Sequence, residues 1–378
     1  MQQRIAYLDA LRGFLMTLGV FLHSARVYDS KQSWRIADGN SSTFFDLVVS
    51  GIHSFRMPVF FVIAGFFCWM ALERFSRSQF LQKRLVRLLV PLVFTALTLN
   101  LFQYFFVNAW VNTSGTEVSL SHYWLTGEWV SHLWFLVNLI IYHGLAIGVF
   151  YALAQSPWIT RIDKHKNTIL MGVLGVLFIY PIVLGFVFSL LPALNIMLFN
   201  QIPFESLLFY IPYFFVGAAL FCFPQFLTFF DSYRFYYLLL TLLIITLLAC
   251  IHAFIPSGLF LTIITKLSAF LLPFILLGLL ASWAKYWFDG AKPWVRNFSD
   301  ASYTIYITHH LLVILVGFAL SFVNVTIFIK YILLVSAVTY LSYTFHYRVV
   351  KHNRLLSFLF NGKSLNKKST PMKAAQAI

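Results

Sequence analysis

Ionisable side chains recur at helical spacing in LDALRGFLMTLGVFLHSARVY, the apolar segment over residues 8–28. Positions 9, 12, 16, 19, 23 and 26 follow one another in steps of three and four residues, which puts them on one face of a helix. A histidine on such a face can act as a general base near neutral pH, and a carboxylate one turn from an arginine can orient it. We therefore predict His23, Arg12 and Asp9 as catalytic residues. The alternative for His23 is a structural hydrogen bond to a neighbouring helix.

Cationic groups follow in the second apolar segment and in the loop after it. SGIHSFRMPVFFVIAGFF carries His53 and Arg56 one helical turn apart. ERFSRSQFLQKRLVRLLVP places Lys83, Arg84 and Arg87 at the beginning of the third apolar segment. Because guanidinium groups bind phosphates and carboxylates well, these five residues are predicted to bind an anionic donor substrate. The alternative for the loop is the usual excess of Lys and Arg on the cytoplasmic side of a membrane protein.

Aromatic rings cluster where the chain is expected to leave the opposite side of the membrane. AWVNTSGTEVSLSHYWLTGEWVS and the following SHLWFL contain Trp124, Trp129, His132 and Trp134. Tryptophan offers an apolar face and one hydrogen-bond donor, which suits stacking on a sugar ring. We predict that these four residues bind an acceptor substrate. The alternative is an aromatic belt at the membrane surface.

A second polar cluster is expected in DASYTIYITHHLL, which contains Ser302, Tyr306, His309 and His310. Adjacent histidines lie roughly 100° apart around a helix, so these two do not readily face one metal ion. No pair of metal-ligating residues in these segments has the i, i+4 spacing of a helical zinc site, and no metal is predicted.

The composition defines the class of protein. Of 378 residues, 60% are hydrophobic and only 10% are charged, whereas soluble proteins carry roughly 25% charged residues. The formal net charge of +15 comes from short loops between apolar runs, which indicates membrane topology rather than binding to nucleic acid. The chain is predicted to be an all-α polytopic integral membrane protein.

About ten transmembrane helices are expected, and the Lys and Arg distribution places both termini in the cytoplasm. A transmembrane domain is predicted over residues 6–350, followed by a basic, partly disordered cytoplasmic tail over residues 351–378. The expected spans are residues 11–28, 47–72, 88–108, 132–153, 168–190, 206–222, 235–254, 259–283, 298–322 and 327–347.

Several of these motifs resemble those of the membrane acyltransferase-3 family. Arg12 followed after ten residues by His23 is similar to the motif of its first span, and Lys83 to Arg87 is similar to its basic-x-x-x-Arg motif. FFVIAGFF, residues 60–67, resembles its Phe-Phe-x-x-Ser-Gly signature, with Ala64 in place of the serine. We expect this departure to fall in a packing position. IHSFRMPVFFVIAGFF, SHLWFL, IYITHH and LLSFLFNGK resemble, in the same order, segments of a Gram-negative branch of the family that acts on periplasmic glucans.

The resemblance implies a multi-pass enzyme of the bacterial inner membrane that moves an acyl group from cytoplasmic acyl-CoA to hydroxyls of a periplasmic glucan. It implies succinyl-CoA as the donor and no bound cofactor. The residues themselves leave open an acetyltransferase acting on another surface polysaccharide, and a proton-coupled transporter or glycan flippase, because buried His and Arg occur in these classes too. Contact with membrane lipid is expected, and a homo-oligomer stays open.

Overall fold

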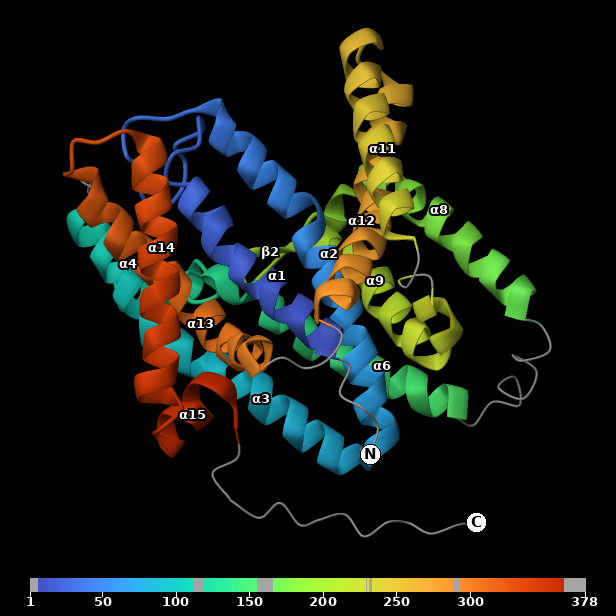
Figure 1. Cartoon of the computed structure of the whole chain (residues 1–378), viewed down its shortest axis with the longest axis horizontal. Helices are drawn as coiled ribbons and strands as arrows, with labels where there is room; N and C mark the ends of the chain where they lie inside the picture. Colours follow the sequence, from blue (N-terminus) through green and yellow to red (C-terminus); the bar gives the residue numbers. More distant parts are fainter. Residues whose placement is uncertain are drawn as a thin grey trace.

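The computed structural model describes residues 6–111, 118–154, 166–228, 230, 233–288 and 293–363, and these residues are almost entirely helical (Figure 1). Within them, one antiparallel pair of short strands is formed by β1 (Met197–Leu198) and β2 (Ile202–Pro203). The long helices are α1 (Ala6–Ala25), α2 (Thr43–Arg74), α3 (Arg77–Leu97), α4 (Leu99–Trp110), α6 (Trp134–Ala154), α8 (Lys166–Leu190), α9 (Phe204–Cys222), α11 (Arg234–Phe254), α12 (Leu259–Phe288), α13 (Pro293–Ser321) and α14 (Ile327–Phe345).

Shorter helices complete the described chain. They are α5 (Leu120–Leu125), α15 (Arg354–Asn361), the 3-10 turns Ser131–Leu133, Pro192–Leu194 and Pro224–Thr228, and a π-helical stretch at His346–Val350. Serine begins two of the long helices, because the hydroxyl oxygen of Ser42 accepts from the backbone N–H of Phe44 and that of Ser76 accepts from Gln79.

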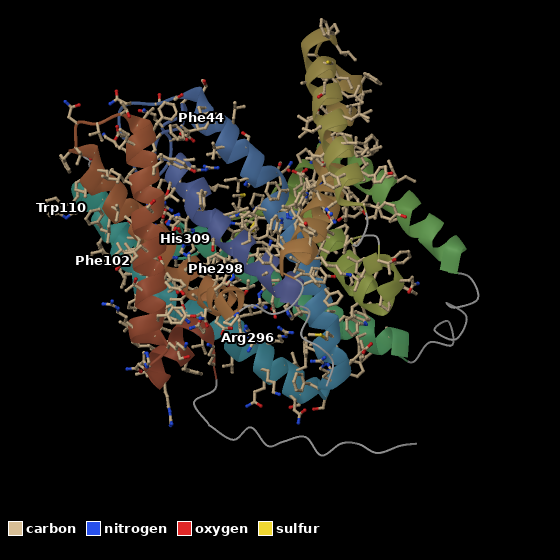
Figure 2. The ribbon with its side chains drawn as sticks, viewed as in Figure 1. Phe44, Phe102, Trp110, Arg296, Phe298 and His309 are labelled. Atoms are coloured by element: carbon tan, nitrogen blue, oxygen red, sulfur yellow. The ribbon has the colours of Figure 1, made fainter. Side chains whose placement is uncertain are left out.

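The helices are long and apolar enough for a membrane protein. Among the described residues, eight helical stretches could cross a bilayer by length and composition, and α1 is not one of them. Large apolar side chains such as Phe102 and Trp110 lie on the outer side of α4 (Figure 2) and are 53% and 68% exposed. The all-α membrane fold is thereby confirmed, and each of the ten predicted spans overlaps a helix. Ten crossings and two cytoplasmic termini stay predictions.

Helix α1 occupies the middle of the bundle, in contact with α2, α12, α13 and α14 (Figure 1). Gly13 lets α13 approach closely, since a Cβ there would lie 3.3 Å from the Cα of Ser299. The Ser299 hydroxyl also donates to the carbonyl oxygen of Asp9 across 3.0 Å. The polar face of α1 therefore points into the protein, as its sequence predicts.

The chain beyond residue 350 belongs partly to the body of the protein. Helix α15 begins at the Asn353 cap, packs against α3 and ends at Gly362, which has a positive φ of 57°. Phe360 is buried in the main core. Helix α15 is amphipathic and packs on the body of the protein, and the predicted boundary between domain and tail at residue 350 stays a prediction. Residues 364–378 of the predicted tail lie outside the described residues.

Candidate active site

A cavity of about 250 Å³ opens between α1, α2, α6, α13 and the loop after α1, and we call it the histidine pocket. Its wall contains the side chains of five histidines drawn from four different helical segments. Figure 2 shows one of them, His309, inside the bundle where α1 and α13 lie together. The five are His23, His53, His132, His309 and His310.

Four of these imidazoles are in mutual contact. The ring centroid of His23 lies 5.3 Å from that of His309 and 4.9 Å from that of His310. His132 lies 4.7 Å from His310, and the two ring planes differ by only 10°. His23 is half-buried, whereas the other three are at most 6% exposed. The ring of His23 is therefore the most accessible of the four to a molecule entering the pocket.

Hydrogen bonds define the neutral tautomers of two of the rings. His309 Nδ1 lies 2.6 Å from the carbonyl oxygen of Tyr306, and His310 Nδ1 lies 2.7 Å from the Oε1 of Gln103. Both oxygens are acceptors, so each Nδ1 carries the hydrogen and each Nε2 keeps its lone pair. His309 Nε2 is buried without a hydrogen-bond partner in the described residues. The cluster thus presents nitrogen atoms that can accept a proton from a bound substrate.

The loop between α1 and α2 covers the cluster. The Trp34 indole stacks on His23 with 5.6 Å between centroids and lies 5.2 Å from His310. Two ion pairs anchor the loop directly after this tryptophan. Arg35 pairs with Glu128, and the buried Lys330 Nζ lies 2.7 Å from Asp38 Oδ2. Trp34 is therefore a fixed part of the pocket wall.

A second cavity, of about 120 Å³, lies nearer the beginning of α1, and we call it the basic pocket. Arg12, Arg84, Arg87 and Lys363 contribute to its wall. Arg12 Nη2 is held 3.1 Å from Asp9 Oδ1, which confirms the predicted pair. Burial lowers the pKa of the Lys363 ammonium from its ordinary value. The wall also contains the carboxylate of Asp300, but its four cationic groups leave an excess of positive charge that is suited to phosphate groups.

The two pockets share part of their walls. Met16 on α1, Phe60 on α2 and Phe135 on α6 line both cavities. The rings of Phe60 and Phe135 meet edge to face with 4.6 Å between centroids. On its own helix, each of the three residues lies one turn from a residue that lines only the basic pocket, for example Met16 from Arg12. An apolar partition one residue thick therefore separates the cationic cavity from the histidines.

The structure divides the predicted donor residues between two places. Arg84 and Arg87 line the basic pocket, but His53 and Arg56 line the histidine pocket. Lys83 lies outside both cavities, exposed, with its Nζ 3.5 Å from the centre of the Phe75 ring. The five residues therefore do not form one anion site, because α2 carries His53 and Arg56 more than two turns away from the loop that precedes α3.

The predicted acceptor residues divide in the same way. His132 and Trp134 line the histidine pocket, where Trp134 stacks on Tyr210 with 5.8 Å between centroids. Trp124 and Trp129 lie outside both pockets and contact each other at 6.1 Å.

The second polar cluster predicted on α13 also faces both cavities. Tyr306, His309 and His310 line the histidine pocket, and Ser302 lines the basic pocket. Ala64, expected at a packing position, lines the basic pocket, whereas the neighbouring Gly65 makes the packing contact.

Sequence reasoning did not assign several residues of these walls to the site. In the histidine pocket they include Trp34, Arg35 and Gln201. In the basic pocket they include His143, whose Nε2 is buried without a partner among the described residues, and Lys363. The sequence does indicate Arg26, which also lines the histidine pocket, because this residue continues the polar stripe of α1. The others sit in loops or in apolar helices, where single polar residues carry no periodic signal.

The described histidines do not form a metal centre. No group of three or more His, Cys, Asp or Glu side chains in the described part of the chain is arranged to hold a metal ion.

A bundle of apolar helices that encloses a histidine cluster beside a cationic cavity has the features of a membrane-embedded enzyme. A family model for an acyltransferase domain, of the acyltransferase-3 type, matches residues 5–347. The chain belongs to this acyltransferase-3 family, and the predicted family is thereby confirmed.

Curated relatives have a common name. The chain is 32% identical over 233 residues to glucans biosynthesis protein C of Escherichia coli (strain K12), a match that covers 59% of this chain and 60% of that protein. The protein of the same name from Escherichia coli O17:K52:H18 is 31% identical over 240 residues, 61% of each chain. The chain thus matches about three fifths of the length of these relatives. No solved structure matches it.

Proposed function

We propose that this protein transfers a succinyl group from cytoplasmic succinyl-CoA to a hydroxyl group of a periplasmic glucan. The main support is the partition of Met16, Phe60 and Phe135 between a cationic pocket and a pocket of proton acceptors. A donor whose phosphates occupy the basic pocket needs to pass its pantetheine arm and acyl end through one layer of side chains to bring the thioester to the histidines. The name of the curated relatives supports a glucan as acceptor.

The chemistry assigned to this site is direct acyl transfer. His23 is the general base, because it is the most accessible imidazole of the cluster and faces the pocket from α1. It takes the proton of the acceptor hydroxyl while the hydroxyl oxygen attacks the thioester carbonyl carbon. The new C–O ester bond forms, the C–S bond breaks, and the departing CoA thiolate takes up a proton from the imidazolium or from water.

We assign Arg12 to binding of the acyl-CoA donor. Eleven residues separate it from His23, which is roughly 16 Å along the helix axis, so the two side chains act on different parts of the substrate. Asp9 holds the Arg12 guanidinium in place through their ion pair. Arg84 and Arg87 supply further cations for the CoA phosphates. No bound cofactor is needed in this scheme.

The test is transfer by the purified protein in lipid nanodiscs. It is given succinyl-CoA labelled in the succinyl group together with an unmodified glucan. We expect labelled glucan, and free CoA in equal amount. Transfer from acetyl-CoA but not from succinyl-CoA would favour an acetyltransferase acting on a surface polysaccharide. Intact acyl-CoA in this assay, together with movement of glucan across the membrane of sealed proteoliposomes, would favour a transporter or flippase and would contradict the proposal.

The location in the inner membrane and the cytoplasmic position of both termini belong to the same proposal. A reporter fused after residue 378 should be active only in its cytoplasmic form. Periplasmic activity of that fusion would place the basic pocket on the wrong side for cytosolic acyl-CoA.

A further inference from the structure

The wall of the histidine pocket carries an excess of positive charge. Three arginines, Arg26, Arg35 and Arg56, contribute to it, and no aspartate or glutamate is among its described lining residues. Arg35 is neutralised by Glu128 in the neighbouring loop. Within the described residues the other two guanidinium groups have no carboxylate partner, which leaves the cavity complementary to an anion.

Arg56 is the more deeply placed of the two. It is 9% exposed, and its Nε is buried without a hydrogen-bond partner in the described part of the chain. The Nε of Arg26 is likewise buried without a hydrogen-bond partner among the described residues. Buried guanidinium groups are normally paired, because an isolated charge is costly to remove from water. Arg56 is such a buried group and Arg26 is half-buried, so these two guanidinium groups facing one cavity indicate that a ligand supplies the missing acceptor atoms.

The guanidinium of Arg56 lies next to the histidine cluster. A Cβ built on Gly19 would lie 2.6 Å from Arg56 Nη1 and 3.2 Å from His309 Nε2, so both groups border the space that this glycine leaves free. Arg56 also precedes Phe60 of the partition by four residues, about 6 Å along α2. An anion on Arg56 is therefore about one helical turn beyond the point where an acyl group would enter the pocket.

We infer that Arg56, with Arg26, binds the free carboxylate at the far end of a dicarboxylic acyl group, so that this enzyme selects such acyl groups over unsubstituted ones. The inference rests on the proposed function and specifies its donor. In a succinyl group two methylene carbons separate the thioester carbonyl from the carboxylate. This short spacer lets the carboxylate reach Arg56 while the carbonyl stays beside the histidines.

The experiment measures binding with a matched pair of thioesters of N-acetylcysteamine, succinyl and butyryl. Both carry four-carbon acyl groups, but only the first ends in a carboxylate, and neither contains the phosphates of CoA. We expect wild-type protein in nanodiscs to bind the succinyl thioester about 10- to 100-fold more tightly, as for a hydrogen bond between charged groups. Arg56→Gln should remove this preference, and Arg56→Lys should retain part of it.

Arg35→Gln is the control, since it removes a positive charge from the same wall at a guanidinium that already has a partner. It should change the binding of both thioesters by the same factor. Equal binding of the two thioesters by wild type, or an undiminished preference in a folded Arg56→Gln protein, would overturn the inference. Binding does not require turnover, so failure of transfer to glucan in the nanodisc assay would count against the proposed function separately.

Discussion

His309 donates its Nδ1 hydrogen to the carbonyl oxygen of Tyr306 across 2.6 Å, within a single turn of α13. This bond leaves Nε2 as the proton acceptor in the neutral ring, and Nε2 borders the histidine pocket beside Gly19. His309 is therefore chemically able to act as a base, 5.3 Å from the ring of His23. The two histidines differ in access, because His309 is only 1% exposed.

That difference predicts unequal effects of two substitutions. His23→Gln should lower the rate of transfer to glucan by roughly 10²–10⁴ and leave acyl-CoA affinity unchanged, because glutamine cannot act as a base near neutral pH. His309→Asn keeps a donor in the position of Nδ1 and should lower the rate far less. Single-turnover transfer and CoA binding measure both effects. A nearly active His23→Gln together with an inactive His309→Asn would assign the base to His309.

The basic pocket predicts which cations matter for the donor. Replacing Arg84 and Arg87 with Gln should weaken acyl-CoA binding about tenfold or more, because each loses a charge-assisted hydrogen bond to phosphate. Lys83→Gln is the matched control from the same helix, since Lys83 lies outside the cavity over Phe75. It should bind acyl-CoA like wild type in calorimetry.

Arg84 also donates to the carbonyl oxygen of Phe67 across 2.8 Å, so its replacement affects local structure as well. Arg87→Gln alone is therefore the cleaner variant. Equal losses of acyl-CoA affinity in Lys83→Gln and Arg87→Gln would mean that this part of α3 acts only through its overall charge.

The position of the tryptophans relative to the histidine pocket likewise predicts which of them contributes to binding of the acceptor. Trp134 lines the histidine pocket, whereas Trp124 is 40% exposed and lies outside it. Trp134→Ala should raise the glucan concentration needed for half-maximal transfer by roughly tenfold, as expected for loss of about 1–3 kcal/mol of ring stacking, by analogy with base–aromatic stacks. The acyl-CoA dependence should not change. Steady-state kinetics in both substrates test this, and a parallel change in both would indicate a structural role.

Periodicity made the centre of this site predictable. The polar stripe of α1 placed Arg12 and His23 on one face, and the structure puts them in two cavities that meet at Met16 on that same face. The all-helical membrane fold followed from composition for a similar reason: apolar runs of about 20 residues have few other solutions.

The grouping of residues from different helices was not predictable. Arg56 and Arg84 look alike as cations near apolar segments, yet the length of α2 separates them into different pockets. Trp34 lies in a loop whose course depends on the buried pair of Lys330 and Asp38. Such long-range contacts leave no local pattern, because each partner is a single polar residue in its own segment.

The close crossing of α2 and α9 gives a prediction about stability. A Cβ on Gly65 would lie 1.8 Å from the carbonyl oxygen of Phe214, and a Cβ on Gly217 would lie 1.8 Å from that of Val62. Each glycine thus fits against the backbone of the other helix, and backbone cannot move aside as a flexible side chain can. Small residues at such crossings are what let membrane helices pack closely. Gly65→Ala should therefore force the helices apart, at a cost of about 1–3 kcal/mol or more.

Gly144 on α6 supplies the matched control, because a Cβ there would meet nothing within 4 Å. Gly144→Ala should leave stability unchanged or raise it by up to about 1 kcal/mol through the higher helix propensity of alanine. Thermal unfolding in one detergent, followed by tryptophan fluorescence, compares the two variants with wild type. We expect a melting temperature several degrees lower for Gly65→Ala alone. If both variants unfold at the wild-type temperature, α2 and α9 do not cross as closely in the protein as the two glycines indicate.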